Sequence, residues 1–218
     1  DVCEYLNFDL KEIDQFPKLI HELKFDLKGL NVTIPYKEKV LKFLHEIDED
    51  AEKIGAINTI KVTKKGKLKG YNSDVVGFEN SIKPLLKEHH KKALILGTGG
   101  ASKAIAYALK KNDITFKFVS RKPEKEHQIS YESLSEKILK EHTIIINCTP
   151  LGTFPDIEKH PNIPYQFITE KHLLYDLIYN PEITTFLSKG KEKSAAIKNG
   201  YEMLELQAEE SWRIWNEL

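Results

Sequence analysis

The sequence predicts an α/β protein of two domains, an N-terminal α/β domain followed by a doubly wound domain with a parallel sheet. In the first third of the chain, strand-like and helix-like patterns alternate, and residues 56–62 and 67–71 flank a Lys-Lys-Gly turn as in a β-hairpin. From residue 93 onward, short continuous apolar runs alternate with helical segments, which is typical of a parallel sheet covered on both faces. The length of 218 residues fits one large or two small domains.

The elements expected in each domain follow from these patterns. In the first domain we expect strands at residues 4–10 and 30–34, a helix at 13–23, and helical segments at 38–47 and 48–54. In the second we expect helices at residues 75–86, 101–110, 134–139 and 201–215, and strands at 93–96, 114–119, 143–147 and 173–177. We assign residues 1–78 to the first domain and 79–200 to the second, and we expect the C-terminal helix, residues 201–218, to join the first.

Composition excludes several classes of function. Lys+Arg and Asp+Glu number 33 each, so the chain lacks the basic excess of a nucleic-acid or membrane-surface binder. No apolar run is long enough to span a membrane. The two cysteines, Cys3 and Cys148, and the eight histidines have no metal-ligand spacing, so we expect no disulfide framework and no metal. A reducing, cytoplasmic location fits, and we expect a monomer or a homodimer.

A glycine-rich loop follows the first apolar strand of the second domain. It leads directly into the expected helix at 101–110 and consists of Gly97, Thr98, Gly99, Gly100 and Ala101. Glycines let the backbone approach a pyrophosphate, and a helix N-terminus offers N–H groups and the positive end of its dipole. This strand–loop–helix context predicts a Rossmann-type, dinucleotide-binding domain, the alternative being a plain tight turn.

The end of the next strand indicates which dinucleotide binds. An NAD site usually has an Asp or Glu about 20 residues after the loop, where it binds the ribose 2′-OH. Here the expected strand at 114–119 is followed by Ser120, Arg121 and Lys122. Because arginine can make bidentate hydrogen bonds to a 2′-phosphate, we predict NADP(H) as the cofactor. An ordinary charged loop is the alternative.

Three polar clusters lie near the expected domain junction, at residues 31–37, 56–59 and 72–74. Hydride transfer to a ketone needs a general acid or base for the oxygen, and a lysine assisted by a carboxylate can serve. Lys37, at the end of the cluster at 31–37, is the candidate for this role. Each cluster is also compatible with a turn or a helix cap, and Asp74 could cap the helix at 75–86.

These motifs resemble the shikimate dehydrogenase family over nearly the whole chain. The resemblance rests on Gly29–Lys37, Ile54–Thr59, Gly70–Gly77, Gly97–Ala104, Ser120–Lys122, Asn147–Gly152, Asp176–Pro181 and Asn199–Leu204 with Gln207. Two motifs depart slightly from the family pattern. Ser73 stands where the family usually has threonine, and Ser120-Arg121-Lys122 stands at its usual Asn-Arg-Thr.

The resemblance implies an NADPH-dependent oxidoreductase that reversibly reduces 3-dehydroshikimate to shikimate, in the pathway to chorismate and the aromatic amino acids. It implies that Lys37 and Asp74 are catalytic. It also implies a set of substrate-binding residues, namely Thr33, Asn58, Tyr179 and Gln207. The cofactor would contact Gly97, Thr98, Gly99, Gly100, Ala101, Ser120, Arg121, Lys122, Thr149, Gly200 and Met203.

Two alternatives stay open at this point. One is a quinate/shikimate dehydrogenase, including one that uses NAD; Arg121 and Lys122 count against NAD but not against quinate. The other is a non-catalytic sensor that keeps the dinucleotide fold, against which the retention of both Lys37 and Asp74 counts. Family members begin with a strand and a Ser-x-Ser segment that holds the substrate carboxylate. The sequence starts at Asp1 without one, so we expect the true N-terminal segment to be missing.

Overall fold

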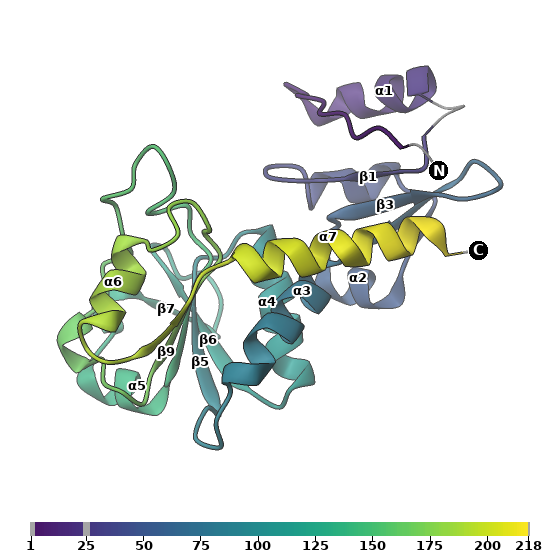
Figure 1. Ribbon diagram of the computed structural model, residues 1–218. Coiled ribbons are helices and arrows are strands. Elements are labelled where there is room, and N and C mark those ends of the chain that lie inside the picture. Colours follow the sequence, from purple (N-terminus) through teal and green to yellow (C-terminus); the bar gives the residue numbers. More distant parts are fainter. Residues whose placement is uncertain (1–2, 24–26, 218) are drawn as a thin grey trace. The chain divides into compact units, whose positions relative to one another are not determined.

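The computed structural model describes residues 3–23 and 27–217 (Figure 1). The chain divides into two compact units, residues 1–71 and residues 72–218. The α/β character expected from the sequence is confirmed in both units, because each contains a sheet with helices packed against it.

The first unit contains a four-stranded sheet in the order β1-β3-β4-β2. The strands are β1 (Gly29–Asn31), β2 (Glu46–Ile47), β3 (Thr59–Val62) and β4 (Leu68–Tyr71). The expected hairpin is confirmed, since β3 and β4 pair antiparallel, and Gly66 in their turn has a φ of 72°. That left-handed conformation favours glycine. β1 is shorter than the expected strand at 30–34.

The helices of the first unit cover an apolar core. They are α1 (Phe16–Leu23), which follows a 3₁₀ turn at Ile13–Gln15, a 3₁₀ helix at Lys39–Phe43, and α2 (Glu49–Ile54). The Asp48 carboxylate caps α2 by accepting a hydrogen bond from the Asp50 N–H at 3.1 Å. The core consists of Phe16, Val40, Ala51, Ile57, Ile60 and Leu68.

The strand expected at residues 4–10 is wrong. These residues form no strand and, apart from Leu10, are exposed. Two hydrogen bonds made through side chains connect them to the unit. The Tyr5 hydroxyl donates to Asn31 Oδ1 at 2.9 Å, and the Tyr36 hydroxyl donates to the Leu10 carbonyl at 2.7 Å. A strand needs a neighbouring backbone to pair with, and an apolar pattern does not supply one.

The prediction of a helix at residues 38–47 is also wrong, because these residues form the 3₁₀ helix at Lys39–Phe43 and then β2. The His45 N–H donates to the Leu68 carbonyl at 3.0 Å, and the Asp48 N–H donates to the Gly70 carbonyl at 2.9 Å. Pairing with β4 therefore overrides the local helical preference.

The second unit contains a six-stranded sheet in the order β10-β9-β8-β5-β6-β7, in which all neighbouring strands are parallel. The strands are β5 (Lys92–Leu96), β6 (Thr115–Ser120), β7 (Gln128–Ser130), β8 (Ile144–Asn147), β9 (Leu173–Asp176) and β10 (Ala196–Lys198). Counted from β5, the spatial order is 3-2-1-4-5-6, that of a doubly wound dinucleotide-binding sheet. This confirms the predicted fold class. The sequence patterns did not predict β7 and β10.

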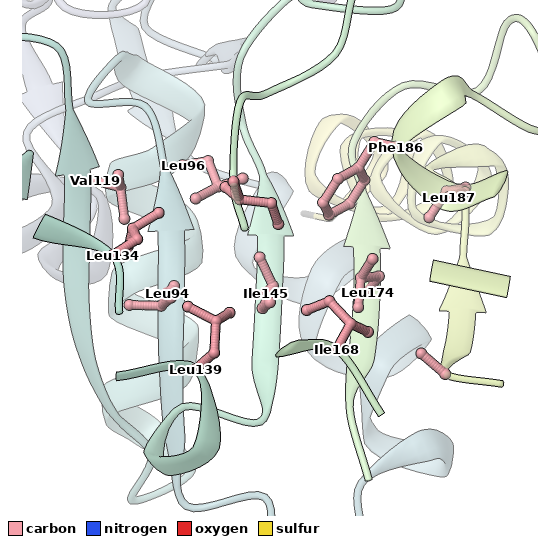
Figure 2. Packing of buried hydrophobic residues seen from close by; sticks show 12 residues of the cluster. Leu94, Leu96, Val119, Leu134, Leu139, Ile145, Ile168, Leu174, Phe186 and Leu187 are labelled. Atoms are coloured by element: carbon pink, nitrogen blue, oxygen red, sulfur yellow. The ribbon is translucent and has the colours of Figure 1, made fainter. Parts of the chain in front are cut away.

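Helices cover both faces of this sheet (Figure 1). The helices of the second unit are α3 (Asp74–Ile82), α4 (Gly100–Lys111), α5 (Glu136–Glu141), α6 (Thr185–Lys191) and α7 (Tyr201–Asn216), with 3₁₀ turns at Lys83–Leu85, Tyr131–Ser133 and Tyr165–Phe167. Of these, α7 packs on α3. Figure 2 shows the core on the α5/α6 face, where Leu94, Leu96, Ile145 and Leu174 of the strands meet Leu139 and Phe186. Among the described residues, no helix combines the length and apolar character needed to cross a membrane.

α7 packs closely against α3 within the second unit. The close approach depends on Gly77, where an added Cβ would lie 2.7 Å from the Met203 carbonyl oxygen and 3.0 Å from Gln207 Cβ. A side chain at position 77 would therefore push the two helices apart. The packing fixes the N-terminal end of α3 beside the middle of α7.

Candidate active site

The glycine loop lies at the carboxyl end of β5 and leads into α4. Gly97 has a φ of 103°, and its N–H donates to the Val119 carbonyl at 2.9 Å. A Cβ there would also lie 3.2 Å from Thr149 Cγ2, so both conformation and space favour glycine. Gly99 is the N-cap of α4 and would have nothing within 4 Å of an added Cβ. α4 therefore begins at an uncrowded glycine, and the N–H groups of a helix's first turn suit an anion.

This loop lies at the point where the strand order reverses. β5 pairs with β6 on one side and with β8 on the other, and Leu96 of β5 lies opposite Asn147 of β8. The loops after β5 and β8 therefore emerge side by side, and an added Cβ at Gly97 would contact Thr149 and Cys148. In open α/β sheets, this crevice at the carboxyl ends of the strands is where ligands bind.

The predicted phosphate-binding residues lie at the end of the adjoining strand. Ser120 is the last residue of β6, and its Oγ accepts a hydrogen bond from the Lys122 N–H at 3.2 Å. Arg121 and Lys122 are exposed. A cationic guanidinium thus lies next to the glycine-loop edge, where the adenosine ribose of a bound dinucleotide would be placed.

The remaining cofactor candidates follow strands on the other side of the switch point, Thr149 after β8 and Gly200 and Met203 after β10. Asn147 Oδ1 accepts hydrogen bonds from the Thr149 N–H at 3.0 Å and from its hydroxyl at 2.6 Å. Gly200 precedes α7 and donates its N–H to the Ile178 carbonyl at 3.0 Å. An added Cβ at Gly200 would lie 2.6 Å from the Leu177 carbonyl carbon. Gly200 and the following turn with Met203 are therefore held against the loop after β9.

Two more predicted residues, Asp74 and Gln207, lie on α3 and α7, the two helices that pack against each other. The Ser73 hydroxyl donates to Gln207 Oε1 at 3.4 Å, and Gln207 Nε2 donates to the Leu204 carbonyl at 2.9 Å. Asp74 is 6% exposed and is the first residue of α3, not its N-cap, which is Ser73. Asp74 thus lies in the first turn of α3.

The first unit brings together its own three predicted residues. The Ile57 N–H donates to the Lys37 carbonyl at 2.7 Å, and the Val32 N–H donates to the Asn58 carbonyl at 2.8 Å. These two bonds hold segments 31–37 and 56–59 side by side. The Asn58 side chain is 3% exposed and accepts a hydrogen bond from the Thr59 hydroxyl at 3.0 Å. Thr33 is exposed and Lys37 is half-buried.

The predicted site residues are thus divided between the two units. Thr33, Lys37 and Asn58 belong to the first, and Asp74, Tyr179 and Gln207 to the second. Tyr179 follows β9 and is 47% exposed. Across the described residues, no group of three or more His, Cys, Asp or Glu side chains is arranged to hold a metal ion.

Sequence reasoning gave no role to Asn147, Asp176 or Thr184, which form a buried hydrogen-bonded network at the carboxyl edge of the sheet. A signal for two of them was present. Asn147 and Asp176 are polar residues that each end an otherwise apolar run, and polar groups at such positions face the ligand crevice of a parallel sheet.

Comparison with known proteins agrees with this geometry. Residues 2–60 match the model of the shikimate dehydrogenase substrate binding domain. The chain is 38% identical to "Shikimate dehydrogenase (NADP(+))" of Methanococcus maripaludis, covering 97% of this chain and 80% of that protein. It is 40% identical to the protein of the same name from Clostridium botulinum, covering 97% and 84%.

The chain belongs to the shikimate dehydrogenase family. Solved structures of the family share its fold. A shikimate dehydrogenase in complex with NADP⁺ is 32% identical, with a TM-score of 0.85, covering 97% of this chain and 78% of that one. The Thermus thermophilus enzyme, in complex with NADP(H) and shikimate, is 28% identical, with a TM-score of 0.82, covering 95% and 80%. The resemblance read from the sequence motifs is therefore confirmed.

Proposed function

We propose that this protein is an NADP-dependent oxidoreductase that catalyses the reversible reduction of 3-dehydroshikimate to shikimate by NADPH. The observation that carries the proposal is the glycine loop at the switch point of the second sheet, with Arg121 at the end of the adjacent strand, in a chain of this family. Close relatives named for NADP⁺ and a family structure holding both NADP(H) and shikimate support the choice of cofactor and substrate.

The cofactor would be held by residues of the second unit. The N–H groups of Gly99, Gly100 and Ala101 at the start of α4 bind the pyrophosphate. Arg121, with Lys122, binds the 2′-phosphate, and Ser120 adds a hydroxyl at the same place. The nicotinamide cofactor supplies hydride chemistry when it is bound. Thr149, Gly200 and Met203 line the other half of the crevice.

The substrate would be handled by groups from both units. Lys37 exchanges a proton with the substrate oxygen at which the alcohol forms, and Asp74 supports that exchange as the neighbouring carboxylate. Thr33, Asn58, Tyr179 and Gln207 hold the ring hydroxyls or the carboxylate of the substrate. We assign substrate binding to residues 1–78 with the helix at 201–218, and cofactor binding to residues 79–200.

A steady-state assay with two alcohols and two cofactors tests the proposal. We expect shikimate-dependent formation of NADPH from NADP⁺, with a higher kcat/KM than for quinate, and with NADP⁺ preferred to NAD⁺. Equal or better use of quinate would instead identify a quinate/shikimate dehydrogenase. Binding of NADP⁺ without turnover of either alcohol would favour a non-catalytic sensor.

A further inference from the structure

Asp176, the last residue of β9, has a fully buried carboxylate that accepts three hydrogen bonds. Its Oδ1 accepts from Asn147 Nδ2 at 3.0 Å and from the Ile178 N–H at 3.1 Å, and its Oδ2 accepts from the Thr184 hydroxyl at 2.6 Å. All three donors are uncharged. Burying a carboxylate with neutral donors costs stability, and such groups concentrate at functional sites.

The first donor connects the carboxylate to the loop after β8. Asn147 donates to Asp176 through Nδ2 and accepts both the N–H and the hydroxyl of Thr149 through Oδ1. With Nδ2 directed at the carboxylate, Oδ1 is directed at Thr149, so Asp176 fixes which way the amide faces. Thr149 in turn borders the glycine loop at Gly97. The orientation of Thr149 therefore depends on Asp176.

The second donor connects the carboxylate to the start of α7. The Ile178 N–H donates to Asp176, and the Ile178 carbonyl accepts the Gly200 N–H at 3.0 Å. The peptide backbone at Ile178 thus links Asp176 to Gly200. The third donor, Thr184, also caps α6, because its Oγ1 accepts the Leu187 N–H at 3.3 Å. A single carboxylate therefore joins the segments that follow β8 and β9.

These segments lie on the β8–β9 side of the switch point. A dinucleotide spans the crevice with one nucleotide on each side, and Arg121 occupies the β6 side, where the 2′-phosphate would bind. The second nucleotide therefore lies against Thr149 and Gly200. We propose that Asp176 is a positioning residue that holds Thr149 and Gly200 in place for this second nucleotide of the cofactor. The inference rests on the proposed function as an NADP(H) enzyme.

The network requires the ionised carboxylate. A protonated Asp176 would become a donor at one oxygen and lose one of its three hydrogen bonds. Burial raises the pKa of Asp176 to about 6, and the hydrogen bonds from Thr184, Ile178 and Asn147 oppose that rise. The titratable groups facing it are Cys148 and Tyr165, and burial raises the pKa of both. Neither of these two groups changes its charge near neutral pH. Near that pH, the hydrogen-bonded network therefore changes only through protonation of Asp176.

The substitution Thr184→Val tests the proposal, with Thr184→Ser as the matched control. Valine keeps the shape of threonine but removes the hydroxyl, whereas serine keeps the hydroxyl. Without that donor, the ionised form of Asp176 loses support and its pKa should rise by about one unit. The dissociation constant of NADP⁺ is measured by calorimetry for both variants across a pH series. Because the phosphate of NADP⁺ titrates in the same way in both measurements, its effect cancels in the ratio of the two dissociation constants.

We expect the ratio of the two dissociation constants, Val over Ser, to be close to one at about pH 8.5 and to reach about fivefold to tenfold at about pH 5.5. A ratio that stays constant over this range would overturn the proposal, because loss of the α6 cap alone has no such pH dependence. Failure of the wild-type protein to bind NADP⁺ would overturn the proposed function as well. If the protein binds NADP⁺ but does not turn over shikimate, the pH dependence of the ratio still tests the role of Asp176, whereas the proposed function fails.

Discussion

The Ser73 hydroxyl lies 3.4 Å from Gln207 Oε1, although 134 positions separate the two residues in the sequence. The contact joins two motifs that the sequence singled out separately, one before α3 and one on α7. It is possible because Gly77 lets the two helices approach closely. The side-chain amide of Gln207 is thereby held beside the start of α3, where Asp74 lies.

Replacing Gly77 with alanine should destabilise the protein. The new Cβ would lie 2.7 Å from the Met203 carbonyl oxygen, a backbone atom that can move only if α7 moves. We expect the free energy of unfolding to fall by about 1–3 kcal/mol, the usual cost of overpacking. Urea denaturation measures it. Gly99→Ala is the control, because its Cβ would meet nothing within 4 Å, and equal stability of the two variants would contradict the packing described.

Replacing Lys37 with alanine should lower kcat by about 10²-fold to 10⁴-fold, the usual contribution of a general acid–base, with a smaller effect on KM. Steady-state kinetics with shikimate and NADP⁺ measure both. Asp74→Asn should also lower kcat, and the double variant should lose less than the product of the two effects because the residues act together. Lys64→Ala, in the exposed β3–β4 turn, is the control. A Lys37→Ala variant with wild-type kcat would remove Lys37 from the mechanism.

Replacing Arg121 with alanine should weaken NADP⁺ binding by about 2–3 kcal/mol, the range of a charged hydrogen bond. NAD⁺ binding should hardly change, because NAD⁺ has no 2′-phosphate. Calorimetric titration with each cofactor compares the two. Lys91→Ala is a charge-matched control, since Lys91 is exposed at the opposite end of β5. An equal loss of affinity for both cofactors would contradict the assignment.

Stability should increase with pH just below neutrality, because three buried histidines are held neutral. Burial lowers the pKa values of His90, His142 and His172 below 6.5. In the window between those lowered values and 6.5, the unfolded chain binds more protons, so the stabilisation is complete above 6.5 and is lost as pH falls. Asp176 acts oppositely between 3.8 and about 6, where its raised pKa makes stability fall as pH rises.

With three histidines against one carboxyl, we expect the free energy of unfolding to increase from about pH 5.5 to about pH 7. Urea denaturation across this range measures it. His172→Gln should remove part of the increase, because an amide can hydrogen-bond to Thr169 and Leu139 without titrating. If the free energy of unfolding of the wild-type protein stays constant or decreases over this pH range, the three histidines do not control its stability at acidic pH.

The sequence predicted the second unit better than the first. Its apolar strands are buried on both faces, so runs such as Ala93–Leu96 are continuous and leave little ambiguity. The two outer strands, β7 and β10, were missed because they are short and only half-buried. In the first unit, β2 has only two residues and exists because it pairs with β4, which no local pattern indicates.

The roles of the candidate site residues stay predictions. Glycine and charge patterns singled out residues such as Gly97 and Arg121, because the pattern itself indicates the chemistry. Asp176 was not given a role, because its importance comes from donors at positions 147, 178 and 184, which only the fold brings together. The alternative role of Asp74 as a helix cap is wrong, because Ser73 is the N-cap and Asp74 is the first residue of α3. A polar residue before an apolar periodic segment does not indicate by itself which residue begins the helix.

The most direct test of the proposed activity follows the transferred hydrogen. The protein is incubated with 3-dehydroshikimate and NADPH carrying deuterium at the transferable C4 position, and the product is analysed by mass spectrometry. We predict shikimate carrying one deuterium at the new alcohol carbon, formed at least about a hundredfold more slowly by Lys37→Ala. Unlabelled shikimate, or no shikimate from a protein that binds NADPH, would contradict the account.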